Sequence, residues 1–319
     1  MKQVVVGIDI GGTFTKYGFV DRDGKILKDD SISTSAYNKV DDYIKELNRS
    51  IQENLSKLSD VEVIGIGIGA PNGNYYHGTI EFAPNLKWKG IVPLVDLFSK
   101  FYKMPIVMTN DANAAALGEM IYGGARDMKN FIEITLGTGL GSGIVVNGDV
   151  VYGHDGFAGE LGHTIVKYNG RQCGCGRRGC LETYASATGI KRTVYKLLAD
   201  TLEDSSLRSV SYDNLTAEMI SHAATEGDKI ALQAFEYTGS LLGIKLAESV
   251  AHTSPEAIFL FGGLAKAGNF ILNPTRQYME ENLLPIYRNK VKILMSELND
   301  LNAAVLGSAA LAWKEIEKK

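Results

Sequence analysis

All three cysteines of the chain lie within eight residues, and a histidine precedes them. His163, Cys173, Cys175 and Cys180 give the spacing His-x9-Cys-x-Cys-x4-Cys, with three glycines between the first and the last thiol. Four nitrogen and sulfur ligands suit a tetrahedral Zn²⁺ in a closed, structural site, and glycines let a short loop wrap around the ion. Because the spacing differs from the more common Cys-x2-Cys, the clustering of the ligands, rather than a standard zinc-finger pattern, predicts the zinc site.

Two glutamates flank this cluster. Glu160 stands three residues before His163, and Glu182 follows Cys180 by two residues. A metal ion that held the loop would also fix the directions of these side chains. Two carboxylates and an imidazole can form hydrogen bonds with neighbouring hydroxyls of a sugar. Isolated surface glutamates are usually only solvated, so both interpretations are open at this stage.

Two glycine turns follow apolar runs, Gly11-Gly12-Thr13 and Gly137-Thr138-Gly139. Glycines allow backbone N–H groups to point into one concavity that holds an anion, and threonine hydroxyls add donors. The two turns together could hold the phosphates of one nucleotide, whereas either alone could simply close a β-hairpin. The match "GIGIGA" at residues 65–70 does not indicate a dinucleotide site, because residues 71–74 predict a turn where a helix should begin.

An aspartate lies where a predicted strand meets a predicted helix. The segment "MPIVMTNDANAAALGE" indicates a strand through Thr109 and a helix that begins at Asn110 or Asp111. Asp111 therefore lies at the carboxyl end of a strand, where α/β sheets build sites, although a helix cap alone would also explain it. Phosphoryl transfer from ATP needs Mg²⁺ and a base for the acceptor hydroxyl. Asp111 suits the base, and Asp9 beside the first glycine turn could hold Mg²⁺ or stabilise the turn.

The elements that would position these residues alternate between strands and helices. "VVVGIDIGGTFTKYGFV" predicts two strands joined by a tight turn, and the pattern returns 125 residues later, where Gly137-Thr138 matches Gly12-Thr13. Apolar residues at every third or fourth position predict a helix over residues 37–58. Further helices are expected after Asn110, over 228–252 and over 302–315. Two similar halves of this kind indicate an α/β fold with mixed sheets.

Composition narrows the class of partner and the location. The net charge is −4, and the only compact basic spot is Arg177-Arg178, so we expect no nucleic-acid partner. No apolar run reaches the roughly 18 residues of a membrane span, so we expect no membrane partner. The N-terminal apolar run is too short for a signal peptide, and the cysteine count is odd. A cytoplasmic protein without disulfides is the expectation.

Taken together, these motifs resemble the ROK family of repressors and kinases, and within it the bacterial glucokinases. The resemblance runs nearly end to end and rests on seven motifs in the family's order: "DIGGT", "PNLKW", "NDANAAALGE", "TLGTGLGSG", "GELGH", "CGCGRRGCLE" and "FGGLAKAG". The combination is far more specific than any single motif.

The resemblance implies an actin-like (ribonuclease H-like) duplicated α/β fold, with two domains of mixed sheets and a cleft between them. We expect a small domain of residues 1–110 plus 301–319, and a large domain of residues 111–300 that carries the zinc loop. ATP would lie on the glycine turns, with Gly262 and Gly263 beside the adenosine. A homodimer or higher homo-oligomer is the expected assembly.

The same resemblance assigns roles at the sugar. The family's sugar contacts correspond to Asn110, Asp111, Glu160, His163 and Glu182. Asp111 would be the general base that frees the C6 hydroxyl of glucose to attack the γ-phosphate of ATP. His163 would bind zinc with one ring nitrogen and contact the sugar with the other.

Two departures from the family pattern bear on the substrate. Asn72 stands where the family often has glycine, which affects the wall of the sugar pocket, and Ser142 replaces a common glycine, for which we expect little effect. Alternatives within enzymes are kinases for N-acetylmannosamine, N-acetylglucosamine or fructose, and polyphosphate as the donor. Alternatives from other classes are a non-catalytic sugar-sensing regulator and a zinc-ribbon module for nucleic acid. Asp111 argues against the first, and the acidic balance argues against the second. No helix-turn-helix segment precedes Asp9, which favours a kinase over a repressor.

Overall fold

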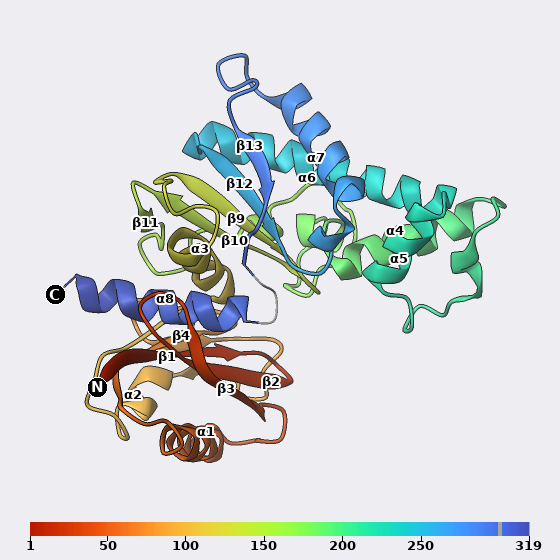
Figure 1. The fold of residues 1–319 in the computed structure, drawn as a ribbon. Coiled ribbons are helices and arrows are strands. Elements are labelled where there is room, and N and C mark those ends of the chain that lie inside the picture. The colour runs from red at the N-terminus through yellow and green to blue at the C-terminus, as the bar shows by residue number, and fades with distance from the viewer. Residues whose placement is uncertain (299–301, 319) are drawn as a thin grey trace. The chain divides into compact units, whose positions relative to one another are not determined.

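The computed structural model describes residues 1–298 and 302–318, which form two compact units (Figure 1). The first unit contains residues 1–128, residues 150–158 and the C-terminal stretch that begins at Glu297. The second unit contains residues 129–149 and 159–296. The domain transition that we expected at residues 300 and 301 lies outside the described residues, as does residue 319.

The first unit is built on a five-stranded mixed sheet with the order β3-β2-β1-β4-β8. Its strands are β1 (Lys2–Ile10), β2 (Phe14–Val20), β3 (Ile26–Ser33), β4 (Val61–Gly69) and β8 (Ile106–Thr109). β1 is antiparallel to β2 and parallel to β4, which is in turn parallel to β8. A small sheet of β5 (Gly73–Asn74), β6 (Thr79–Glu81) and β7 (Ile91–Val92) accompanies it. The helices are α1 (Val40–Leu55), α2 (Leu94–Phe98), α3 (Asp111–Tyr122) and α8 (Ala303–Glu317).

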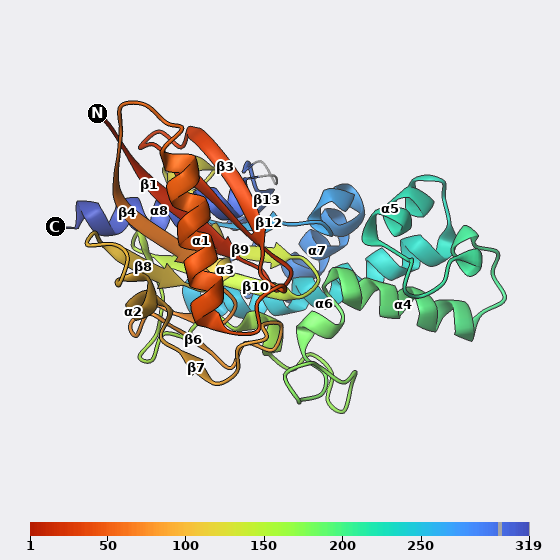
Figure 2. The ribbon, with the colours of Figure 1, turned by 90° about the horizontal axis from the view of Figure 1, so that it is seen from below.

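Alternating side chains decide which helix covers which face of this sheet. Val6 and Ile8 of β1 point into a buried cluster with the apolar stripe of α1, and Figure 2 shows α1 lying across that face. Val5 points to the opposite face, where it packs with Val305 and Ala309 of α8. The N-terminal strand therefore contributes to two cores, and the last helix of the chain completes the first unit (Figure 1).

Glycines allow α8 to lie directly on the backbone of the sheet. Gly7 of β1 and Gly67 of β4 are register partners. A Cβ atom at Gly67 would lie 1.8 Å from the carbonyl oxygen of Ser308, and one at Gly7 would lie 2.2 Å from that of Val305. Because backbone atoms occupy the space that a side chain would need, no other residue type fits at these two positions without moving the helix.

The second sheet repeats the design, with the order β11-β10-β9-β12-β13. Its strands are β9 (Phe131–Leu136), β10 (Leu140–Val146), β11 (Asp149–Val150), β12 (Ala257–Phe261) and β13 (Lys292–Met295). The helices of this unit are α4 (Ala187–Asp200), α5 (Ala217–Thr225), α6 (Lys229–Thr253) and α7 (Asn269–Asn282). Short 3-10 turns are η1 (Leu161–His163), η2 (Leu181–Thr183), η3 (Ser206–Ser209) and η4 (Ala265–Ala267). Its large core includes Ile134 and Leu260 of the strands and Phe235 and Leu246 of α6.

The predicted duplication is confirmed by this topology. In each sheet an antiparallel hairpin comes first, and its turn is the predicted glycine turn, residues 11–13 between β1 and β2 and residues 137–139 between β9 and β10. The predicted helices over 37–58, after Asn110, over 228–252 and over 302–315 appear as α1, α3, α6 and α8. The strands and helices thus place both turns at the carboxyl ends of equivalent strands.

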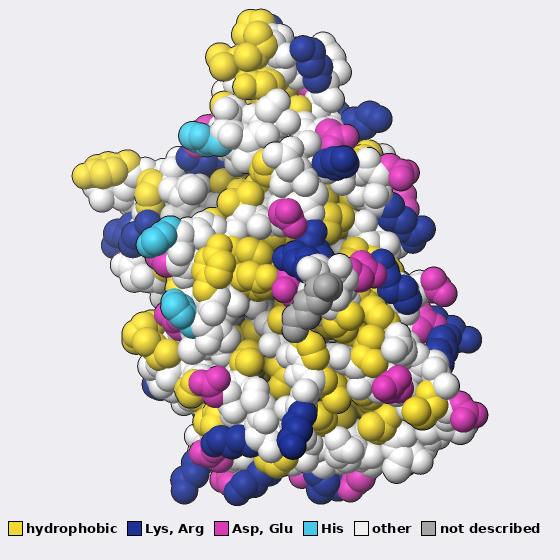
Figure 3. Space-filling view, turned by 90° about the vertical axis from the view of Figure 1, so that its left-hand side faces the viewer, with side chains coloured by type: hydrophobic (Ala, Val, Ile, Leu, Met, Phe, Trp, Pro, Cys, Tyr) yellow, Lys and Arg dark blue, Asp and Glu magenta, His cyan; other side chains and the backbone are white. Residues whose placement is uncertain are grey.

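The surface agrees with the low net charge. On the face drawn in Figure 3, Lys and Arg side chains alternate with Asp and Glu, without a broad patch of one sign among the coloured residues. Within residues 1–298 and 302–318, every helix is too short or too polar to cross a bilayer.

The contact between α8 and the sheet can be tested with Gly67→Ala. The added methyl group would meet the Ser308 carbonyl, so we expect the free energy of unfolding of the first unit to fall by about 1–3 kcal/mol. Urea unfolding of the variant and the wild type measures this difference. Gly263→Ala is the matched control, because a Cβ atom there has no atom within 4 Å, and its effect should stay within about 0.5 kcal/mol. Equal stability of the two variants would contradict the packing argument.

Candidate active site and metal centre

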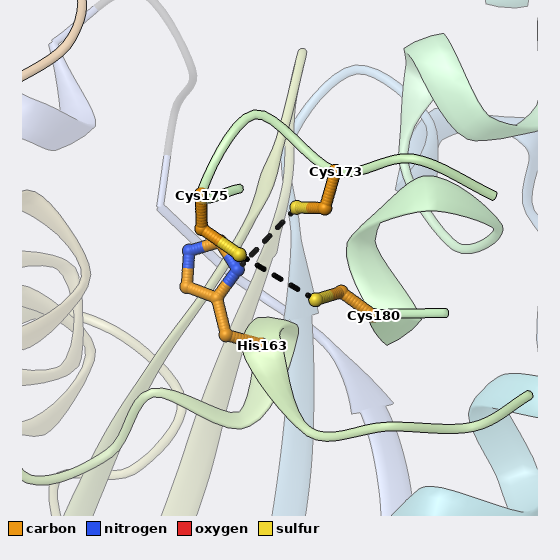
Figure 4. Close-up of side chains that lie close together, drawn as sticks. All are labelled: His163, Cys173, Cys175 and Cys180. Carbon is orange, nitrogen blue, oxygen red and sulfur yellow. Dashed lines mark hydrogen bonds between the residues drawn. The ribbon is translucent and has the colours of Figure 1, made fainter. Parts of the chain in front are cut away.

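The predicted zinc ligands converge in the second unit (Figure 4). One nitrogen or sulfur atom of each of His163, Cys173, Cys175 and Cys180 lies within 4.8 Å of the others. Cys173 Sγ is 3.7 Å from His163 Nδ1, and Cys175 Sγ is 3.6 Å from Cys180 Sγ. Bonds of ordinary length to a tetrahedral Zn²⁺ place two sulfurs about 3.8 Å apart and a sulfur and a nitrogen about 3.6 Å apart. The four side chains therefore fit this ion with little movement.

Local backbone geometry brings the ligands together. His163 ends η1, and Cys180 directly precedes η2. Between them the chain folds back on itself, since the Cys173 N–H donates to the Arg177 carbonyl and Gly176 adopts a positive φ of 89°. The Arg177 guanidinium donates to the His163 carbonyl at 2.8 Å, which ties the cysteine loop to the histidine. Sequence reasoning did not find this role of Arg177, because its partner is a backbone atom 14 residues away.

The protonation of the thiols favours a cation at this place. Burial raises the pKa of Cys173 to about 12, and the neighbouring thiols add to the effect. Burial also opposes ionisation of Cys175, but hydrogen bonds from Arg177 and from the other thiols lower its pKa to about 6. One thiolate thus forms readily, while a second would meet a like charge at close range. A divalent cation removes that conflict, because metal-bound thiols are deprotonated.

Glu182 connects the cysteine loop to the second glycine turn. Its Oε2 accepts a hydrogen bond from the Leu140 N–H at 3.1 Å, and its Oε1 accepts one from the Cys173 thiol at 3.5 Å. A Cβ atom at Gly139 would lie 2.4 Å from Oε2, so the glycine is required for this approach. Glu182 is therefore held by the turn, and it is not the solvated surface glutamate of the alternative interpretation.

The second glycine pair lies beside the same turn. Gly262 and Gly263 follow β12, and the Leu264 N–H after them donates to the carbonyl of Leu136, the residue before Gly137. Gly262 has a φ of 102°, and a Cβ atom there would lie 2.8 Å from the Leu136 carbonyl oxygen. The parallel strands β9 and β12 thus end in two adjacent exposed glycine turns, as a site for a polyanion requires.

In the first unit the structure decides between two cap candidates. The Asn110 side chain accepts a hydrogen bond from the Asn113 N–H at 2.7 Å, so Asn110 is the N-cap of α3. Asp111 is the first residue of the helix, and its Oδ1 accepts a hydrogen bond from the adjacent Ala112 N–H at 2.9 Å. Asp111 is exposed as a residue, yet the protein around its carboxyl group desolvates that group and raises its pKa. The side chain is therefore available for chemistry.

Asp9 neighbours Asp111 across the sheet. It pairs with Gly69 of β4, which pairs with Thr109 of β8, so both carboxylates lie at the carboxyl ends of parallel strands. Burial raises the pKa of Asp9 from 3.8 to about 6. Repulsion from the Asp111 carboxylate adds to this shift, and attraction to Lys16 opposes it. A carboxyl group whose charge is disfavoured by a neighbouring carboxylate suits a bound cation, which offsets that repulsion.

The first glycine turn is closed by its own backbone. The Gly11 N–H donates to the Phe14 carbonyl at 3.0 Å, and the Thr13 carbonyl accepts from residues that follow β3. A Cβ atom at Gly12 would lie 2.7 Å from the carbonyl oxygen of Asn85, so "PNLKW" packs against the turn. Asn72 lies elsewhere in this unit, with a φ of 51° that asparagine tolerates, and its amide donates to the Glu81 carbonyl at 2.9 Å. Its side chain is thus held by a local turn.

Comparisons with known proteins agree with these features. A family model described as "ROK family" matches residues 5–315. A glucokinase from Halalkalibacterium halodurans is 36% identical over 97% of this chain and 95% of its own length. A xylose repressor from Caldicellulosiruptor bescii is 29% identical over 98% of this chain and 78% of its own length. The structure of a ROK family glucokinase from Streptomyces griseus, in complex with glucose and AMPPNP, matches with a TM-score of 0.82 and 32% identity, covering 98% of this chain and 99% of that chain. The expected actin-like duplicated α/β fold is confirmed.

The metal centre predicts the effect of Cys175→Ser. Cys175 is the exposed thiol of the cluster, so its loss removes a ligand without opening a cavity in the core. We expect about one zinc per chain in the wild type and a loss of most of it in the variant, measured by inductively coupled plasma mass spectrometry. Tyr168→Phe, an exposed change in the same loop, should keep the metal. A variant Cys175→Ser with a full equivalent of zinc would refute the ligand assignment.

The raised pKa of Asp9 predicts how stability depends on pH. The folded protein holds this proton more tightly than the unfolded chain, so stability is lost as pH rises from about 4 to about 6, by at most about 3 kcal/mol. Asp9→Asn cannot ionise, so the stability of the variant relative to the wild type should increase over that range. Urea unfolding at pH 4.5, 5.5 and 7, without nucleotide or Mg²⁺, measures this. A difference that does not change with pH would contradict the assignment.

Proposed function

The chain belongs to the ROK family, and we propose that it is a sugar kinase that transfers the γ-phosphoryl group of ATP to the C6 hydroxyl of glucose. The proposal depends most on the carboxylate of Asp111 at the start of α3. Asn110 caps this helix, so Asp111 is not needed as the cap, and the pKa of Asp111 is raised. The sequence similarity to glucokinases, 36% and 32% identity over nearly the whole chain, supports the same reaction and the same acceptor.

In this proposal Asp111 accepts the proton of the C6 hydroxyl as its oxygen attacks the γ-phosphorus. A raised pKa makes the Asp111 carboxylate a stronger base toward the sugar hydroxyl. The Ala112 N–H bonds one carboxylate oxygen, and in this proposal the other oxygen meets the sugar hydroxyl. The bond from the γ-phosphorus to ADP breaks as the new ester bond forms, so the products are ADP and glucose 6-phosphate.

The sugar would be recognised by side chains that other contacts within the protein already orient. Glu182 is bonded to the Leu140 N–H, and the Nδ1 of His163 faces the thiols (Figure 4), so its Nε2 is left for a sugar hydroxyl. Asn110 and Glu160 would add further hydrogen bonds. Zinc in the cluster would fix the tautomer and the direction of His163 without meeting the reacting atoms.

ATP would be held by the glycine turns at residues 11–13 and 137–139, with Gly262 and Gly263 beside the adenosine. Asp9 suits Mg²⁺, because this ion is usually bound by one or two carboxylates together with the phosphates of the substrate. When bound, Mg²⁺ would neutralise charge on the transferring phosphoryl group. We expect the protein to be located in the cytoplasm. The expected oligomeric state is a homodimer or a larger homo-oligomer.

A regulator is the second candidate, since a xylose repressor matches 98% of this chain. A sensor would bind a sugar without turnover, and a kinase for an N-acetylated hexose or fructose would turn over a different acceptor. Release of ADP from Mg-ATP with glucose, mannose, fructose, N-acetylglucosamine and N-acetylmannosamine separates these cases. Preference for glucose supports the proposal, another preferred sugar moves the acceptor, and silence with every sugar refutes a kinase that uses ATP. Polyphosphate is then tested as the donor.

The role of Asp111 predicts the effect of Asp111→Asn. Without the base, kcat should fall by about 10²–10⁴, while the dissociation constant for glucose changes by only a few fold. Steady-state kinetics and isothermal titration calorimetry measure the two effects. Asp96→Asn removes a carboxylate from the first turn of another helix, α2, and should leave kcat unchanged. If Asp111→Asn kept most of its activity, the carboxylate would not be the base.

A further inference from the structure

Ser142 lies on β10, three residues beyond the second glycine turn, and is 2% exposed. It was a departure from the family pattern for which we expected little effect. In the structure its hydroxyl points to the segment that carries Glu160. The Ser142 hydroxyl donates to the Gly159 carbonyl and accepts from the Leu161 N–H, which lies 3.2 Å away. It therefore bonds the residues on both sides of Glu160.

The three residues 159–161 form an inverse γ-turn. The Leu161 N–H donates to the Gly159 carbonyl at 2.8 Å, and Glu160 between them has φ −78° and ψ 52°. Glu160 occupies the apex of the turn, with an exposed side chain. The single hydrogen bond of such a turn closes a small ring and cannot be straight, so it holds the apex only weakly. The Ser142 hydroxyl supplies two further bonds, one at each end of the turn.

Two glycines allow the backbone at this turn to lie close to β10. Gly159 has a φ of 93°, and a Cβ atom there would lie 3.0 Å from the Ser142 carbonyl oxygen. A Cβ atom at Gly162 would lie 2.2 Å from the Leu140 carbonyl oxygen. The backbone therefore lies close enough to β10 for a side chain as short as serine to reach it. The close backbone contacts at Gly159 and Gly162 fix the position of the turn on β10, and the Ser142 hydroxyl stabilises the conformation of the turn.

We propose that Ser142 is a positioning residue, whose hydroxyl holds the γ-turn at Glu160 and thereby sets the affinity for the sugar. The inference rests on the proposed function, in which Glu160 contacts the sugar. Since Leu140 on the same strand bonds Glu182, β10 would orient both glutamates at the sugar. Ser142 itself contacts neither reactant.

The test compares Ser142→Ala, Ser142→Thr and the control Thr135→Val. Removing the hydroxyl with alanine should raise KM for glucose by about tenfold, with kcat and KM for ATP changed less than about twofold. Threonine keeps a hydroxyl and should restore most of the affinity. Thr135 of β9 accepts the Gly141 N–H at 3.2 Å, so Thr135→Val removes one hydroxyl contact to the neighbouring residue of β10 without touching the turn. Its KM for glucose should be unchanged.

A second readout does not depend on turnover. Hydrogen exchange of the peptide that spans residues 159–163, without sugar, should become faster in Ser142→Ala and not in Thr135→Val, while the zinc content stays that of the wild type. Faster exchange together with the higher KM supports the inference. An active protein in which Ser142→Ala leaves KM for glucose unchanged overturns it, whatever the exchange shows. A wild type that phosphorylates no sugar refutes the proposed function instead.

Discussion

The first unit depends on a contact between backbones that only glycine permits. At Gly7 and Gly67 the strands present no side chain, and the carbonyls of α8 occupy the space where Cβ atoms would lie. The same helix meets α3 closely, since a Cβ atom at Gly307 would lie 2.3 Å from the carbonyl oxygen of Ala114. Because Asp111 is the first residue of α3, the last helix of the chain supports the position of the proposed base.

The second unit brings several ionisable groups close together, the thiols of the cysteine cluster and Glu182. The thiols of the cluster cannot all ionise together without a cation, and Glu182 lies within hydrogen-bonding distance of one of them. In strand β10 the Leu140 N–H donates to Glu182, and the Ser142 hydroxyl bonds the backbone on both sides of Glu160. A metal ion on one side and a strand on the other would then leave the proposed sugar contacts little freedom, which lowers the cost of ordering them on binding.

Much of the fold could be predicted because its signals are local. The two hairpins, their glycine turns and the four predicted helices each depend on short stretches of consecutive residues, and they appear where the patterns placed them. The four predicted metal ligands converge for the same reason, since their spacing is short and their chemistry narrow. Local patterns could not choose between Asn110 and Asp111 as the cap, because both residue types cap helices well and only the hydrogen bond to Asn113 distinguishes them.

By itself the sequence determined which chemistry is available: soft ligands for a metal, glycine turns for phosphates, and an aspartate at the end of a strand. The tertiary structure alone decided which of these groups touch. Glu182 meets the Leu140 N–H from 42 residues away, Ser142 reaches the two neighbours of Glu160, and Gly67 lies under Ser308. These contacts join residues far apart in the chain, and they arise from how strands and helices pack in space, which no periodicity or spacing along the sequence encodes.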